Sequence, residues 1–221
     1  QLPATLKQMD VAAFQGCSSL KELMIPAGVT ALARNLFRDC SSLTSVSIPD
    51  GVISIGDYAF SNCSSLVHVE FPSTLTAIRE SAFDSCAALT DLSFPKSMKS
   101  IDTSAFVGCT SLRELSFPDG MTFIGSYAFS GCTGLQSVFL PESVTTIGGA
   151  AFYHCNSIQI SAPAGSYAEH YAEKNHIAFQ ADGSVQGGDY MTQITEEGTW
   201  LKYAGPGGDI VFPEGKKSVS P

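Results

Sequence analysis

The cysteines and histidines are the first side chains in this sequence to consider for chemistry, and the cysteines are regularly spaced. They stand 23 residues apart, at Cys17, Cys40, Cys63, Cys86, Cys109, Cys132 and Cys155. Thiols can form disulfides, bind a metal ion or act as nucleophiles. Each of these three kinds of chemistry requires a different arrangement of the thiols and their neighbours.

None of the three kinds of chemistry suits this pattern. An odd number of cysteines leaves one unpaired, and side chains stacked in register point in parallel directions, which suits disulfide geometry poorly. A metal site needs clustered ligands, and no such cluster recurs. A nucleophile needs a base within hydrogen-bond reach, but His68, His154, His170 and His176 lie in different repeats or beyond the last one. We therefore predict buried free thiols that pack as small apolar groups, with no catalytic residue, cofactor or metal.

A fixed period of this length indicates a stacked repeat array. In the six units that start at Cys17 to Cys132, the third residue after the cysteine is leucine and the sixth is leucine or valine. The eighth is isoleucine, phenylalanine or leucine, and proline follows it. This alternation is typical of a β-strand, which proline ends because it has no N–H for a ladder. Stacked strands of this kind predict one main parallel sheet.

The second half of each unit predicts the other side of the array. Two apolar residues three apart, such as Val52 and Ile55, indicate a short second strand. An Ala-Phe pair follows, and we expect a short helical turn there, with Asp57, Ser104 and Ser126 as N-caps. Each turn would bring one phenylalanine into a core stack, at Phe37, Phe60, Phe83, Phe106, Phe129 and Phe152.

The sequence after the seventh, shortened unit differs in kind. Ser166 and Glu169 form a capping box that opens a helix through about Asn175, with Tyr167, Ala168, Tyr171 and Ala172 on one face. This helix and a strand at 177–179 would cap the array, so that the solenoid occupies residues 1–179, with its cap at 164–179. Residues 180–189 have the composition of a linker. Residues 190–221 are expected to form a hairpin around 196–198 and then the start of a further, truncated repeat block.

The unit Cys-x-x-Leu-x-x-Val-x-Ile-Pro-x-x-Val-x-x-Ile-Gly-x-x-Ala-Phe resembles the BspA-like, treponemal-type leucine-rich repeat over about residues 1–163. The segment 166–175 and the segment from Gly205 to Pro213 are similar to pieces between repeat blocks of that family. The resemblance implies a leucine-rich repeat solenoid from a bacterial protein that is secreted or attached to the cell surface. It also implies protein binding or adhesion without catalysis, and it transfers no individual binding residue.

Composition narrows the class of partner. The net charge is −9 and the pI is near 4.8, whereas nucleic acids and anionic membranes require a basic face. No run of residues approaches the roughly 18 apolar residues of a membrane helix. We therefore expect a monomer with a protein ligand, no nucleic-acid partner and no membrane insertion.

The outward positions of the main strands are the candidate binding surface. They vary from unit to unit, unlike the core positions, and solenoids bind along such extended faces. The candidates are Lys21, Met24, Val67, His68, Glu70, Asp91, Arg113, Glu114, Gln136 and Phe139. An ordinary solvated face explains the same variation. Two other functions also fit the sequence, a structural spacer in a longer surface protein and a glycan-binding accessory module, although few aromatic residues on this face support the latter.

Overall fold

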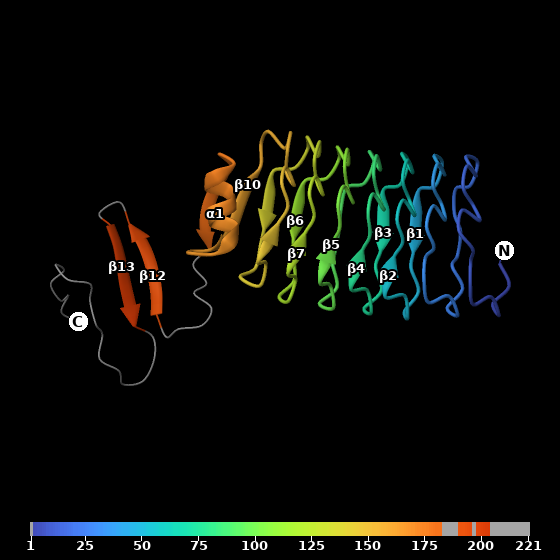
Figure 1. Cartoon of the computed structure of the whole chain (residues 1–221), viewed down its shortest axis with the longest axis horizontal. Helices are drawn as coiled ribbons and strands as arrows, with labels where there is room; N and C mark the ends of the chain where they lie inside the picture. The colour runs from blue at the N-terminus through green and yellow to red at the C-terminus, as the bar shows by residue number, and fades with distance from the viewer. Residues whose placement is uncertain (1, 183–189, 196–197, 204–221) are drawn as a thin grey trace. The chain divides into compact units, whose positions relative to one another are not determined.

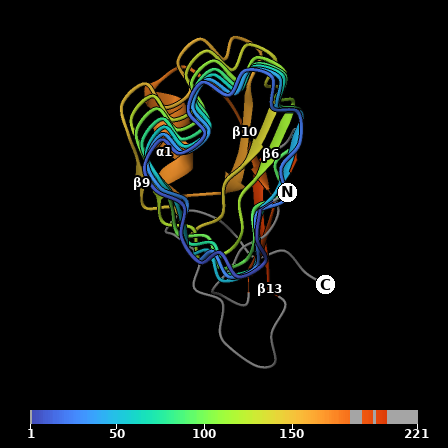
Figure 2. The ribbon, with the colours of Figure 1, turned by 90° about the vertical axis from the view of Figure 1, so that its right-hand side faces the viewer.

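The computed structural model of the chain describes residues 2–182, 190–195 and 198–203. The chain divides into two compact units, Gln1–Ala181 and Asp182–Pro221. The first unit is a solenoid in which each repeat forms one turn, here called a rung (Figure 1). Seen along the solenoid axis, successive rungs follow nearly the same path (Figure 2). The predicted fold class is therefore confirmed.

The main sheet lies along one side of the solenoid. Its strands are β1 (Ser45–Ser47), β3 (His68–Glu70), β6 (Glu114–Ser116), β8 (Ser137–Phe139), β10 (Gln159–Pro163) and β11 (Ala178–Asp182). Equivalent residues pair in parallel, as Val46 does with Val69 and Leu115 with Val138. The middle residue of each three-residue strand is buried and the first is exposed, because successive side chains of a strand point to opposite faces.

The main sheet is interrupted in the rung that begins at Cys86. That rung contributes an isolated bridge, between His68 and Asp91, and no main-sheet strand. The sheet therefore has two parts, β1–β3 and β6–β8–β10–β11.

A second sheet runs along the opposite side of the rungs (Figure 2). It has five parallel two-residue strands, β2 (Ser54–Ile55), β4 (Ala77–Ile78), β5 (Ser100–Ile101), β7 (Phe123–Ile124) and β9 (Thr146–Ile147), in unbroken order. The isoleucine of each strand is buried. The short second strand predicted from the paired apolar residues is thus confirmed.

Between the second strand and the cysteine, each rung forms turns that are bonded to the next rung. The N–H groups of Tyr58, Phe60 and Asn62 each donate to a carbonyl of the following rung, over 2.7 to 2.9 Å. Equivalent bonds join all successive rungs from residue 12 to residue 153. We call this third set of rung-to-rung bonds the turn-side ladder.

The helical turns predicted for this segment are separate turns and not helices. Tyr58 and Asn62 have φ angles of 56° and 61°, and the equivalent residues of the other rungs also have positive φ. Left-handed residues interrupt a right-handed helix, so the intervening N–H groups close single turns only. Ser104, one of the expected N-caps, itself has a φ of 57°.

The core consists of side-chain columns that run along the solenoid. The predicted phenylalanine stack is confirmed, with successive ring centroids 5.0 to 5.5 Å apart from Phe14 to Phe152. A second stack of Phe71, Phe94 and Phe117 packs edge-on against it. Together these two columns form the aromatic part of a core that also contains buried aliphatic side chains.

The thiols form a further column. All seven are free, and those from Cys40 to Cys155 are buried as predicted. Each buried thiol donates to the carbonyl of the phenylalanine 26 residues earlier, over 3.1 to 3.2 Å. Cys17, in the first described rung, is exposed.

Helix α1 (Tyr167–Lys174) packs against the last rung. Ser166 is its N-cap and accepts from the N–H of Glu169, while the Glu169 carboxylate accepts from the N–H of Gly165. This is close to the predicted capping box. Ala168, Tyr171 and Ala172 are buried, whereas Tyr167, which was expected on the same face, is 43% exposed.

The second unit contains an antiparallel pair, β12 (Tyr190–Thr195) and β13 (Gly198–Tyr203). Residues 183–189 of the predicted linker and the predicted repeat block after residue 203 lie outside the described residues. In the described ranges, no helix has both the length and the apolar character needed to cross a membrane.

Candidate functional site

The structure places the ten predicted contact residues on the outer surface of the main sheet, which we call the main-sheet face. Nine of the ten are exposed, and Phe139 is half-buried. Met24 and Val67 are the large apolar residues of this set that are most open to solvent, at 79% and 44%. The face therefore combines apolar side chains with both signs of charge.

The predicted residues do not converge on one compact site. Lys21 and Phe139 are five rungs apart, which corresponds to about 24 Å at the usual strand spacing. The candidates of the middle rungs lie closer together: His68 forms a bridge with Asp91 of the next rung. The interruption of the sheet at Asp91 lies in the centre of this middle region.

Three side chains of the main-sheet face show how its polar groups are held. The Glu70 carboxylate accepts a hydrogen bond of 2.8 Å from the Ser47 hydroxyl of the preceding rung. Arg113 donates from Nη1 to the carbonyl of Gly134, 3.1 Å away in the next rung. A guanidinium has five N–H donors, so Arg113 retains donors for a partner. Each of these residues is thus partly oriented by a neighbouring rung.

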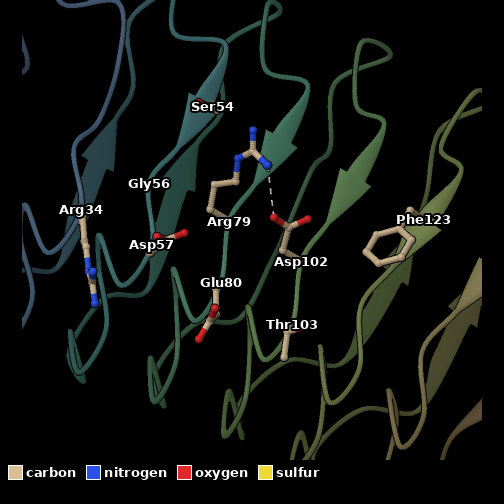
Figure 3. Close-up of a pocket in the computed structure, with 9 residues that line it drawn as sticks. All are labelled: Arg34, Ser54, Gly56, Asp57, Arg79, Glu80, Asp102, Thr103 and Phe123. Atoms are coloured by element: carbon tan, nitrogen blue, oxygen red, sulfur yellow. Dashed lines mark hydrogen bonds and ion pairs between the residues drawn. The ribbon is translucent and has the colours of Figure 1, made fainter.

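Sequence reasoning missed a groove along the second sheet (Figure 3). Its lining includes Arg34 at one end, Phe123 at the other, and the charged residues Asp57, Arg79, Glu80 and Asp102 between them. Arg79 and Asp102 form an ion pair of 3.4 Å between adjacent rungs. We call this feature the second-sheet groove.

The sequence does contain a signal for this groove, because two successive rungs have a charged residue at a repeat position where other rungs have glycine. Arg79 and Asp102 occupy the repeat position of Gly56, Gly125 and Gly148. A Cβ atom at Gly56 or Gly125 would lie 2.5 Å from backbone atoms of the preceding rung, so these glycines permit close contact between rungs. The two charged residues break that pattern side by side and project their side chains outward (Figure 3).

Tyr58 links the second-sheet groove to the turns beside it. Its hydroxyl donates to the Glu80 carboxylate over 2.9 Å. The guanidinium carbons of Arg34 and Arg38 lie 5.7 and 5.6 Å from the centre of its ring, within the range of cation–π attraction. The acid and base groups of this region therefore largely compensate one another.

Burial in the core lowers the reactivity of the thiol column. Burial raises the pKa of Cys40 to about 11 and that of Cys63 to about 12, and it also raises the pKa of Cys86 and Cys109. The thiolate is the reactive form, so these positions disfavour nucleophilic chemistry. Among the described residues, no group of three or more His, Cys, Asp or Glu side chains is placed to hold a metal ion.

His154 and Cys155 are adjacent in sequence but have different partners. The Cys155 thiol donates inward to the carbonyl of Phe129, over 3.2 Å. The His154 ring lies outside against Tyr153, with ring centroids 3.9 Å apart. The two side chains therefore do not form the nucleophile and base pair that their neighbouring positions could suggest.

Comparison with known proteins identifies the repeat. The pattern of the BspA type leucine-rich repeat region matches residues 1–113 and 30–159. The crystal structure of the T. pallidum leucine-rich repeat protein TpLRR is 29% identical, with a TM-score of 0.62 over 72% of this chain and 84% of that chain. The pneumococcal vaccine antigen PcpA shares the fold at 17% identity, with a TM-score of 0.52 over 73% of this chain and 44% of that chain.

A search of curated protein sequences finds no match. The repeat pattern nevertheless covers most of the chain, and the residues that it matches form rungs of the solenoid. The chain therefore belongs to the BspA-type leucine-rich repeat family.

Proposed function

We propose that this protein is a non-catalytic binding module that contacts a protein partner through its main-sheet face. The observation that supports the proposal is the contrast between uniform core columns and varied outward residues on the same strands. His68, Asp91 and Glu114 occupy one repeat position with three different side chains. The buried residues that follow them, Val69, Leu92 and Leu115, are all aliphatic.

The chemistry of the face suits a folded protein partner. Such interfaces combine apolar contacts with a few large or charged side chains that contribute most of the binding energy. Met24 and Val67 provide exposed apolar surface. Arg113 keeps free donors for a carboxylate of the partner. A secreted or cell-surface location, which the family resemblance implies, and an adhesive role belong to this proposal.

The test compares two triple variants of the chain. Val67, Glu70 and Arg113 are changed to serine on the main-sheet face, because each of them is exposed. Ile53, Lys99 and Thr145 are changed to serine as the matched control, since they are exposed on the second-sheet side. Binding to a panel of purified extracellular proteins is measured by biolayer interferometry, and circular dichroism checks the fold.

We expect the face variant to lose at least about tenfold in affinity for each protein that the unaltered chain binds. The control variant should bind normally. Equal binding by the face variant and the unaltered chain would overturn the proposal, and absence of binding to the entire panel would favour the spacer function.

A further inference from the structure

The turn-side ladder ends at the last rung, where its N–H donors are directed toward the position that a following rung would occupy. The N–H groups of Tyr127, Phe129 and Gly131 donate to the carbonyls of the last rung. Their equivalents one rung later are the N–H groups of Ala150, Phe152 and His154. Ala150 and His154 have φ angles of 56° and 62°, close to the 57° and 73° of Tyr127 and Gly131. The last rung therefore presents the same donors in the same conformation, without a further rung.

Helix α1 covers the middle one of these three donors. Tyr171 packs edge-on against Phe152, with ring centroids 6.2 Å apart, and its hydroxyl lies beside the backbone N–H groups of Phe152 and Ala151. The N–H groups of Ala150 and His154, on either side, have no hydrogen-bond partner among the described residues. Tyr171 thus occupies the middle of the open edge and leaves two donors free.

The two free donors border a hollow between the last rung and α1, which we call the cap hollow. Its volume is about 600 Å³. Phe152, Ile158 and Ile177 contribute apolar lining, while Asn156 and His176 contribute polar lining. A pocket with apolar walls and a few convergent polar groups is the usual form of a ligand site.

We propose that the cap hollow binds a short peptide segment whose backbone carbonyls accept from the N–H groups of Ala150 and His154. The acceptors that satisfy equivalent donors elsewhere in the solenoid are peptide carbonyls on alternate residues of the next rung. A peptide that extends an open ladder gains affinity from main-chain bonds, and side-chain pockets add selectivity.

The same geometry defines the peptide. In the last rung, the carbonyls of Gly149 and Tyr153 accept the outer two bonds, so the ligand should offer carbonyls four residues apart. The position equivalent to the stacked phenylalanine must be small, because Tyr171 already covers Phe152. The ligand is therefore a segment with a glycine or alanine at that position and at least one apolar side chain for the hollow.

A capped peptide with the sequence of residues 148–154 and glycine in place of Phe152 is the probe. Amide signals of the full chain are followed by heteronuclear NMR. Before addition, the amides of Ala150 and His154 should exchange rapidly with solvent, whereas those of Tyr127 and Gly131 should be protected by the ladder. On titration, the signals of Ala150 and His154 should shift and their exchange should slow. If the signals of Ala150 and His154 do not shift up to the solubility limit of the peptide, the proposal is overturned. An equal shift of these signals with sodium acetate alone would also overturn it.

A matched pair of variants tests the location. Asn156→Trp places a bulky ring at the cap hollow, and Thr133→Trp places the same ring at the same repeat position one rung earlier. Both residues are exposed, so both variants should fold. Asn156→Trp should weaken peptide binding by at least about tenfold, equivalent to 1.4 kcal/mol, and Thr133→Trp should leave it unchanged. Equal effects of the two variants would show that the peptide binds elsewhere. This result is independent of binding at the main-sheet face.

Discussion

The main sheet and the turn-side ladder join the same rungs in different ways. The main sheet is interrupted at Asp91, and its outward residues change from rung to rung. The turn-side ladder is continuous from residue 12 to residue 153, and the phenylalanine and thiol columns lie beside it. The comparison indicates that the turn side supplies much of the regularity of the solenoid. The main-sheet face is therefore free to vary without loss of the stack.

The largest expected effect is a loss of stability at alkaline pH, caused by the buried thiols beside the turn-side ladder. An unfolded thiol ionises near the ordinary pKa of 9.0, whereas the pKa of folded Cys40 is about 11 and that of Cys63 about 12. The unfolded chain therefore releases protons first as pH rises. We expect the free energy of unfolding to be steady below about pH 9 and to fall between pH 9 and pH 12, with contributions from several thiols. Urea denaturation across this range measures it.

Thiol labelling provides the control for that prediction. At pH 8 the native protein should react at Cys17, its exposed thiol, and the six buried thiols should react only after unfolding. Rapid labelling of several thiols, while the circular dichroism spectrum remains native, would contradict the buried column.

A substitution in the phenylalanine stack should have the next largest effect. Phe83 is fully buried between Phe60 and Phe106, and Phe83→Ala should lower the free energy of unfolding by about 3–5 kcal/mol. Phe139→Ala on the main-sheet face should cost clearly less, because that side chain is only half-buried. Chemical denaturation of both variants measures the difference. Equal losses would show that the phenylalanine stack and the main-sheet face contribute equally to the stability of the fold.

A smaller loss is expected from a substitution where the backbones of adjacent rungs lie close together. Gly56→Ala would place a Cβ atom 2.5 Å from the carbonyl oxygen of Leu32, and overpacking of this kind typically costs about 1–3 kcal/mol. Gly149→Ala is the matched control, because a Cβ atom there has no neighbour within 4 Å. Thermal unfolding of the two variants measures the difference in stability. Equal stability of Gly56→Ala and Gly149→Ala would contradict the close approach of adjacent rungs at Gly56.

Much of the fold could be predicted because it depends on side-chain type at fixed positions. Leu66, Val69 and Phe83 are apolar at recurring intervals, so their burial follows from the repeat. The turn-side ladder was not predicted, since its bonds join backbone groups that every residue has. One signal was available: the residue before each cysteine is often Gly, Asn or Asp, as at Gly108, Asn62 and Asp39. These residue types favour positive φ, which is incompatible with the expected helical turn.

The candidate site could be predicted less completely. Strand periodicity correctly placed His68 and Arg113 outside, but it could not show that neighbouring rungs half-bury Phe139. The second-sheet groove depends on two adjacent exceptions, Arg79 and Asp102, at a repeat position that is glycine at 56, 125 and 148. The cap hollow depends on how α1 packs against the last rung, and no local sequence pattern encodes that packing.

The direction of the turn-side ladder has a consequence for assembly. Each rung donates N–H groups toward the following rung, so the solenoid has chemically different ends. The two ends of a stack of such rungs are complementary to one another, and head-to-tail contacts of this kind do not close but grow into filaments. At the donor end, helix α1 packs Tyr171 over Phe152 in the middle of the edge, and we expect this partial cover to hinder end-to-end stacking of copies.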